Sequence, residues 1–144
     1  MISHILVPLD GTPQAEAALA PADKLARATG ADVTLVRAPH QAEHPQRQGD
    51  YRGEAERSGC ASYLRVCAAR FSPEVQVHTS VLDGAEAVER LLQAAYTFRS
   101  DLILMTSHGR SGMGRLLHGS VAEQVGRRAP FATMFVGCHS SAHS

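Results

Sequence analysis

Five short apolar runs rich in β-branched residues alternate with helical patterns along the chain, and this alternation limits the possible folds more than any other feature. The runs lie at residues 2–9, 33–36, 75–82, 101–106 and 131–136, and helices are expected at 13–29, 51–71, 85–98 and 121–128. Strands separated by helices indicate βαβ units with right-handed crossovers. The sequence therefore predicts an α/β fold: an open five-stranded parallel sheet of order 3-2-1-4-5 with helices on both faces.

The first expected helix carries a start signal, a stop signal and an internal proline. Thr12 is a good N-cap, and Pro13 suits the first helical position because its missing N–H would have no partner there. Gly30 is expected to end the helix. Pro21 lies inside it, where it should bend the helix or displace one backbone hydrogen bond.

The composition fits one globular domain over residues 1–144, with a mobile loop at 39–50 and a frayed tail at 138–144. The 14 basic and 14 acidic residues balance, so no net field attracts nucleic acid or an anionic membrane. No apolar run approaches the roughly 20 residues that a membrane helix needs. Because the opening residues lack the basic region of a signal peptide, we expect a cytoplasmic protein.

Two polar turns that contain glycine leave neighbouring strands of the expected sheet. In open α/β sheets, ligands bind beyond the carboxyl ends of the strands, at the point where the winding direction reverses. The order 3-2-1-4-5 places that point between the first and fourth strands. The segments leaving those strands are 10–12 (Asp-Gly-Thr) and 107–109 (Ser-His-Gly). Topology and composition therefore select the same crevice as the ligand site.

The segment after the fourth strand is rich in glycine. It contains Gly109, Gly112, Gly114 and Gly119. Glycines let the backbone approach a ligand, and Ser120 stands at an expected helix start whose N–H groups favour an anion, so this segment can cradle phosphate. Its spacing alone fits a flexible surface loop with a helix cap equally well. A P-loop motif is absent, and the only lysine, Lys24, lies in the first helix.

The same segment resembles the universal stress protein family. The ATP-binding branch of that family carries a G-x-x-G-x9-G-[ST] pattern after the fourth strand, and Gly109, nine residues and Gly119-Ser120 match its second part. The flanking words His-Gly-Arg-Ser-Gly and Gly-Ser-Val-Ala-Glu are similar too, as is Val-Pro-Leu-Asp-Gly-Thr at 7–12. The resemblance covers 2–136 and implies a Rossmann-like fold of the adenine nucleotide α-hydrolase type.

The resemblance implies roles for residues at both turns. Asp10 would contact the ribose, and the adenine would be lined by Pro8, Leu9 and Ala38. The phosphates would be bound by Gly109, Gly119, Ser120 and the backbone of Val121. The remaining candidate ligand contacts are Thr106, His108, Arg110 and Gly112. The implied cofactor is ATP, with Mg²⁺ or Mn²⁺ arriving on its phosphates.

Two positions depart from the family pattern. The first glycine of the pattern falls on Thr106, and Arg37 replaces the histidine common at the end of the second strand. A β-branched side chain at Thr106 could narrow the site, or its hydroxyl could supply a hydrogen bond. ATP binding is therefore expected, with the branch of the family that binds no nucleotide as the alternative.

Several of these residues also have a purely structural interpretation. Asp10 could serve only as a turn residue that caps the first helix. His108 is better explained as orienting its loop than as a base, since no acidic or nucleophilic partner is evident, and Arg110 suits solvent as well as phosphate. The other histidines and the three cysteines lack metal-ligand spacing, so we expect structural thiols and no metal site.

The last strand, at 131–136, reads Phe-Ala-Thr-Met-Phe-Val and is apolar on both faces, although the expected order places it at the sheet edge. Exposed apolar edges invite pairing with another chain. A two-fold homodimer through this strand, as is usual in the family it resembles, would cover it. The alternative is that helices cover both faces and the edge stays bare.

These observations predict a stress-response regulator that binds ATP or AMP, hydrolyses it slowly or not at all, and acts on a downstream protein that the sequence does not identify. The crevice lacks a lysine for the γ-phosphate and a clear residue to orient water, so we expect no enzyme or at most a weak ATPase. The alternatives are a weak ATPase that uses Asp10 or a bound metal, and a dimeric protein-interaction module that binds no nucleotide.

Overall fold

The structure is a computed structural model that describes residues 2–37, 50–82, 87–106 and 132–136. Its elements are β1 (His4–Pro8), α1 (Pro13–Glu16), α2 (Leu19–Thr29), β2 (Asp32–Arg37), α3 (Asp50–Ala68), β3 (Val77–Val81), α4 (Ala87–Thr97), β4 (Leu102–Thr106) and β5 (Ala132–Val136). The five expected strands are confirmed, with ends moved by one or two residues. The helix expected at 121–128, the loop at 39–49 and the tail lie outside the described residues, and Asp50 belongs to α3 and not to that loop.

The strands form one parallel sheet of order β3-β2-β1-β4-β5, as predicted. β1 is central: it pairs with β2 from His4↔Asp32 to Pro8↔Val36 and with β4 at Ile5↔Leu102. A central strand is buried on both faces, which explains why β1 reads as a continuous apolar run. Its Ile-Leu-Val centre is fully buried.

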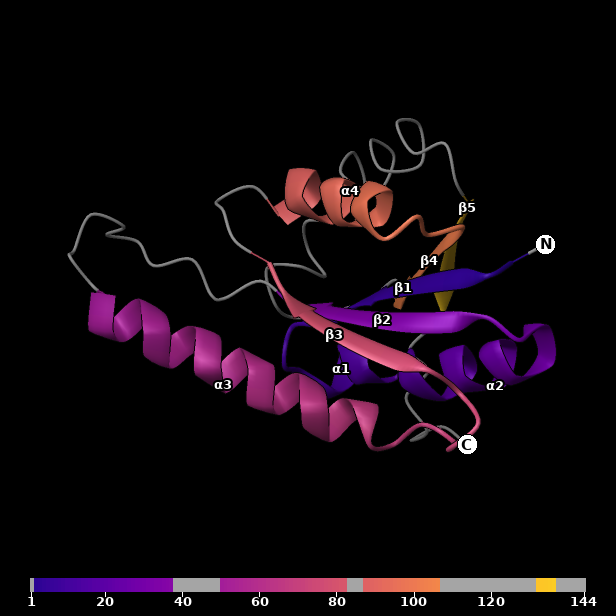
Figure 1. Ribbon diagram of the computed structural model, residues 1–144, viewed down its shortest axis with the longest axis horizontal. Coiled ribbons are helices and arrows are strands. Elements are labelled where there is room, and N and C mark those ends of the chain that lie inside the picture. The colour runs from indigo at the N-terminus through magenta and orange to yellow at the C-terminus, as the bar shows by residue number, and fades with distance from the viewer. Residues whose placement is uncertain (1, 38–49, 83–86, 107–131, 137–144) are drawn as a thin grey trace.

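Helices cover the sheet on both faces (Figure 1). α1, α2 and α3 lie on one side, where Ile5, Val7 and Leu9 pack with buried residues of α2 and α3. α4 lies on the other side, where Leu6 packs in a separate cluster with Leu91 of α4. Successive side chains of a strand point to opposite faces of the sheet, so β1 contributes residues to the hydrophobic cluster on each face.

The expected helix over 13–29 is in fact two helices. After α1, the amides of Ala17 and Ala18 bond to carbonyls three residues back, at 3.3 and 3.2 Å. Pro21 explains the interruption, because it has no N–H to donate to the carbonyl of Ala17 and its ring would clash with that carbonyl. Pro21 instead lies in the first turn of α2, where an amide needs no helical partner. The expected stop is confirmed, since Gly30 adopts φ +78° at the end of α2.

One face of helix α3 packs against the core. Cys60, Leu64 and Cys67, spaced by four and three residues, are all buried, whereas Val66 is exposed. Both cysteines carry free thiols. Burial raises the pKa of the Cys67 thiol. These two cysteines therefore behave as small core residues, in line with their structural interpretation.

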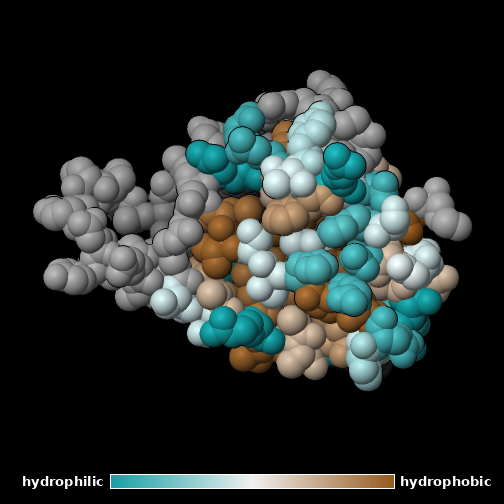
Figure 2. Space-filling view, viewed as in Figure 1, coloured by the Kyte–Doolittle hydropathy of each residue, from teal (hydrophilic) through white to brown (hydrophobic). Residues whose placement is uncertain are grey.

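The two edges of the sheet differ in character. Along β3, Gln76 just before the strand and His78 and Thr79 within it are exposed and polar. This part of the molecule faces the viewer in Figure 2, where hydrophilic and hydrophobic residues are interspersed. Along β5, Ala132 and Met134 are exposed, and Met134 keeps 43% of its surface. Polar groups thus mark one edge, and apolar groups mark the other.

Candidate functional site

The sheet brings two of the expected site segments to one edge. β1 and β4 are paired neighbours, so their carboxyl ends lie side by side at the point where the winding reverses. Pro8 ends β1, Leu9 and Asp10 follow it, and Thr106 ends β4. These four candidate residues therefore lie at the shared carboxyl edge of β1 and β4.

The remaining candidates fall outside the described residues. They are Ala38, His108, Gly109, Arg110, Gly112, Gly119, Ser120 and Val121. Their ligand roles stay predictions of the sequence.

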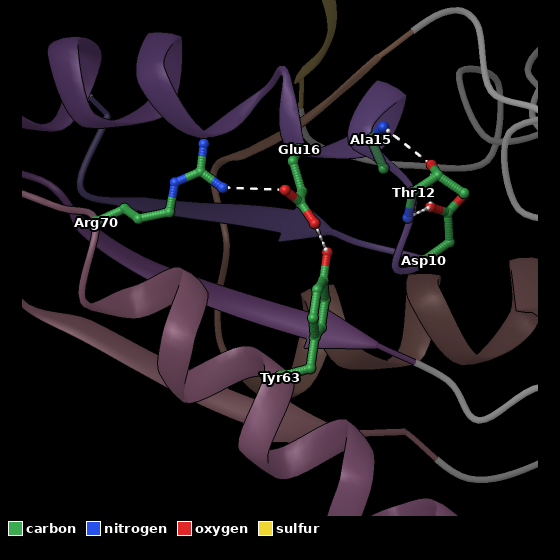
Figure 3. A network of polar contacts seen from close by, with 6 residues as sticks. All are labelled: Asp10, Thr12, Ala15, Glu16, Tyr63 and Arg70. Carbon is green, nitrogen blue, oxygen red and sulfur yellow. Dashed lines mark hydrogen bonds and ion pairs between the residues drawn. The ribbon is translucent and has the colours of Figure 1, made fainter.

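Asp10 organises the turn that follows β1 (Figure 3). Its Oδ1 accepts a hydrogen bond from the backbone N–H of Thr12 at 2.9 Å and another from the Thr12 hydroxyl at 2.6 Å. The Thr12 hydroxyl oxygen in turn accepts from the N–H of Ala15 at 3.2 Å, which caps α1 as predicted. The structural role considered for Asp10 is thus present, and it fixes the carboxylate in place.

The second carboxylate oxygen of Asp10 is not used in this way. Among the described residues, no hydrogen bond or ion pair reaches Oδ2, and the residue is only partly buried. A carboxylate oxygen is a strong acceptor, so Oδ2 can take hydrogen bonds from a ligand. Asp10 therefore combines an oxygen held by Thr12 with one that no described residue engages.

At Gly11 the backbone of this turn lies close to the side chain of Arg37. Its φ is +88°, a conformation that glycine adopts without steric cost. A Cβ at this position would lie 3.0 Å from Nη2 and 3.1 Å from Cζ of Arg37. The Arg37 guanidinium, projecting from the last residue of β2, therefore occupies the space that any larger residue would need.

Arg37 also stacks on α3. Its Cζ lies 4.8 Å from the centre of the Tyr63 ring, within the range of a cation–π contact. Its Nε is buried, and no described residue forms a hydrogen bond with it. In the sequence, Arg37 was noted only as a departure from the family pattern and was not included among the site residues. Its position at the end of the second strand, next to the first, is the signal that could have identified it.

Glu16 ties α1 to α3 behind this turn (Figure 3). Its Oε2 accepts a hydrogen bond from the Tyr63 hydroxyl at 2.6 Å, and its Oε1 forms an ion pair with Nη1 of Arg70 at 3.0 Å. Burial, and then the hydrogen bond to Glu16, raises the pKa of Tyr63. The Tyr63 ring, on which Arg37 stacks, therefore stays a neutral phenol. Its hydroxyl donates to Glu16, whose charge is already paired with Arg70.

The residues expected to line the adenine are packed into the fold. Pro8 is buried, and Leu9 has no exposed surface. Thr106 is 6% exposed and pairs with Val136 in the β4–β5 ladder. At this edge of the sheet Pro8, Leu9 and the β-branched Thr106 are thus part of the packed core.

Residues 2–37, 50–82, 87–106 and 132–136 contain no group of three or more His, Cys, Asp or Glu side chains that could hold a metal ion. In those same ranges, no helix is both long and apolar enough to span a bilayer.

An open parallel sheet of order 3-2-1-4-5 with a polar turn at its switch point defines a Rossmann-like α/β protein. Residues 1–137 match the universal stress protein family, and the chain belongs to that family. A universal stress protein from Thermus aquaticus, in the QAH/OAS sulfhydrylase 3'region, is 31% identical over 140 residues, which cover 94% of this chain and 99% of that protein. The universal stress protein MJ0531 of Methanocaldococcus jannaschii is 42% identical over 55 residues, which cover 38% of this chain but only 32% of that protein.

Solved structures show the same fold. A family member from Burkholderia pseudomallei superimposes with a TM-score of 0.73 at 26% identity, over 94% of this chain and 96% of that one. A universal stress protein in complex with cAMP gives a TM-score of 0.68 at 22% identity, over 96% of this chain and 99% of that one. The Archaeoglobus fulgidus protein in complex with dAMP gives 0.58 at 18% identity, over 94% and 97%.

Proposed function

We propose that this chain is a stress-response regulator that binds an adenine nucleotide in the crevice beyond β1 and β4, with ATP as its ligand and slow or absent hydrolysis. The observation that carries the proposal is Asp10. Thr12 holds its Oδ1, while no described residue bonds to Oδ2. A carboxylate that is already held in place loses little conformational entropy when it accepts hydrogen bonds from the hydroxyls of a ribose, and this favours binding.

The rest of the proposed site follows the sequence. Pro8, Leu9 and Ala38 line the adenine. Gly109, Gly119, Ser120 and the backbone of Val121 bind the phosphates, as the ATP-binding branch of the family implies. Thr106, His108, Arg110 and Gly112 are the further ligand contacts of this proposal. Membership of the family and the cAMP and dAMP complexes of two proteins with this fold support an adenine nucleotide as the ligand.

A binding role is preferred to catalysis because the site lacks a lysine. Lys24, the only lysine, is on α2 and exposed, and α2 covers the face of the sheet and does not end at the crevice. A nucleotidase usually places a cation on the γ-phosphate and a residue that orients the attacking water. The competing hypothesis, a weak ATPase dependent on Asp10, predicts steady release of phosphate that Asp10→Asn abolishes.

We also propose a homodimer through β5. The exposed Ala132 and Met134 on this edge support it, because an apolar edge strand favours pairing. The same surface favours the second candidate function, a dimeric interaction module that binds no nucleotide.

The cytoplasmic location and the single-domain organisation stay predictions of the sequence.

Thermal unfolding with and without ATP and Mg²⁺ tests the nucleotide proposal. A ligand at about 100 times its Kd raises the free energy of unfolding by about 2.7 kcal/mol, and we expect a shift of this order for the wild type. Asp10→Asn keeps an acceptor for Thr12 but replaces Oδ2 by an amide donor. With about tenfold weaker binding, the stabilisation by ATP should fall to about 1.4 kcal/mol.

Asp23→Asn is the matched control. Asp23 accepts hydrogen bonds from the backbone and hydroxyl of Ser72 at 3.0 and 2.9 Å, away from the crevice. This variant should melt earlier than the wild type but gain the same stabilisation from ATP. An equal gain in Asp10→Asn would remove Asp10 from the site, and no gain in the wild type at millimolar ATP would leave the dimeric interaction module.

A further inference from the structure

Arg37 is a half-buried cation at the edge of the proposed site. It ends β2, and its guanidinium lies against Gly11, the residue after Asp10. The Tyr63 ring covers it from α3. Backbone turn and aromatic ring thus hold the side chain in a defined position.

The charge of Arg37 is not matched by the described residues around it. Its Nε is buried without a hydrogen-bond partner. Among residues 2–37, 50–82, 87–106 and 132–136, no carboxylate lies within ion-pair distance of its guanidinium and no acceptor bonds to it. The nearby Glu16 is already paired with Arg70 and bonded to Tyr63, and Oδ1 of Asp10 is engaged by Thr12.

An unmatched guanidinium in such a place is suited to an oxyanion. A polar group taken out of water costs free energy unless it gains a partner. The planar fork of N–H groups fits two oxygens of a phosphate at once, which makes arginine a preferred phosphate ligand. An anionic ligand group beside Gly11 would supply the missing partner.

The position of Arg37 selects the part of the ligand that carries this anion. In dinucleotide-binding sheets an arginine beside the ribose accommodates a phosphate on it. Asp10, the proposed ribose contact, is one residue from Gly11, and the Arg37 guanidinium lies against Gly11. The charges of Asp10 and Arg37 sum to zero, so the pair does not repel a phosphate as Asp10 alone would.

Building on the proposed nucleotide site, we propose that Arg37 binds a phosphate on the 2′ or 3′ position of the ribose, so that the crevice prefers adenine nucleotides phosphorylated there. The side chain then acts as a specificity residue. The ribose phosphate is contacted from the β2 side of the proposed site.

Competitive binding of three nucleotides tests this assignment. The probes are adenosine 5′-monophosphate, adenosine 2′,5′-bisphosphate and adenosine 3′,5′-bisphosphate, titrated into the wild type, Arg37→Gln and Arg37→Lys. We expect the wild type to bind at least one bisphosphate about tenfold more tightly than the monophosphate, the size of effect that a charged hydrogen-bonded contact gives. Arg37→Gln should bind the monophosphate as the wild type does and lose the preference, and Arg37→Lys should keep part of it.

Arg27→Gln is the control for loss of a positive charge, because Arg27 pairs with Asp23 at 3.4 Å on α2 and is 45% exposed. It should keep the full preference. Wild-type protein that binds the monophosphate but shows no preference for either bisphosphate would overturn the role of Arg37 and leave the nucleotide site standing. The role of Arg37 would also be overturned if Arg37→Gln kept the preference for a bisphosphate, or if it weakened the binding of all three nucleotides equally. Binding of none of the three to the wild type would overturn both proposals.

Discussion

His4, the first residue of β1, lies among several titratable groups at the amino ends of the strands. Its Nε2 is 2.6 Å from the hydroxyl of the fully buried Thr34, and its ring stacks on His78 with centroids 6.3 Å apart. Burial lowers the pKa of His4; Asp32 and Asp101 oppose this, and His78 adds to it. The folded protein therefore favours the neutral ring.

This shift gives a pH dependence with a definite sign. Because the folded pKa of His4 lies below the ordinary value of about 6.5, the unfolded chain binds the proton more readily. The free energy of unfolding should be fully present above that value and fall as the pH drops below it. Urea unfolding between pH 7.5 and 5 should show a steeper loss for the wild type than for His4→Gln. Parallel curves would contradict this, and Asp101, whose pKa is lowered by hydrogen bonds from Ser3, should matter only at lower pH.

At this scale, local contacts could be predicted and distant ones could not. The Thr12 cap and the Gly30 stop depend on residues within one turn, so the sequence shows them directly. The contact of Arg37 with Gly11 and Tyr63 joins three separate elements. Only the fold brings these residues together, and the sequence showed no more than an unusual arginine at a strand end.

At the scale of elements, the β5 edge gives a test of the homodimer. Sedimentation should give the wild type twice the chain mass of 15.4 kDa. Met134→Glu should give the single-chain mass, because a charge on an edge strand opposes pairing. Thr79→Glu places the same charge on the exposed β3 edge and should leave the dimer intact. A monomeric wild type, or a dimer that only Thr79→Glu dissociates, would contradict the β5 interface.

The interrupted first helix shows why element boundaries were harder to predict than element types. Apolar periodicity continues through 13–29, so it indicated one helix. The deciding effect is steric: the ring of Pro21 excludes a helical carbonyl at Ala17 and divides the segment into α1 and α2. The sequence identified the proline but not whether the helix would bend or break there.

At the scale of the whole molecule, strand order could be predicted because few topologies satisfy right-handed crossovers with five alternating units. That order predicted the position of the crevice, and Pro8, Leu9, Asp10 and Thr106 lie at the carboxyl ends of β1 and β4. The phosphate side rests on 107–121, which lies outside the described residues. Its role therefore depends on the sequence pattern and on family membership.

Equilibrium dialysis of the wild-type protein against ATP and Mg²⁺ measures directly whether the folded chain holds an adenine nucleotide. We expect saturable binding that approaches one ATP per chain, with little phosphate released over the course of the dialysis. An ATP concentration on the protein side that equals the concentration on the buffer side, up to millimolar ATP, would contradict this binding.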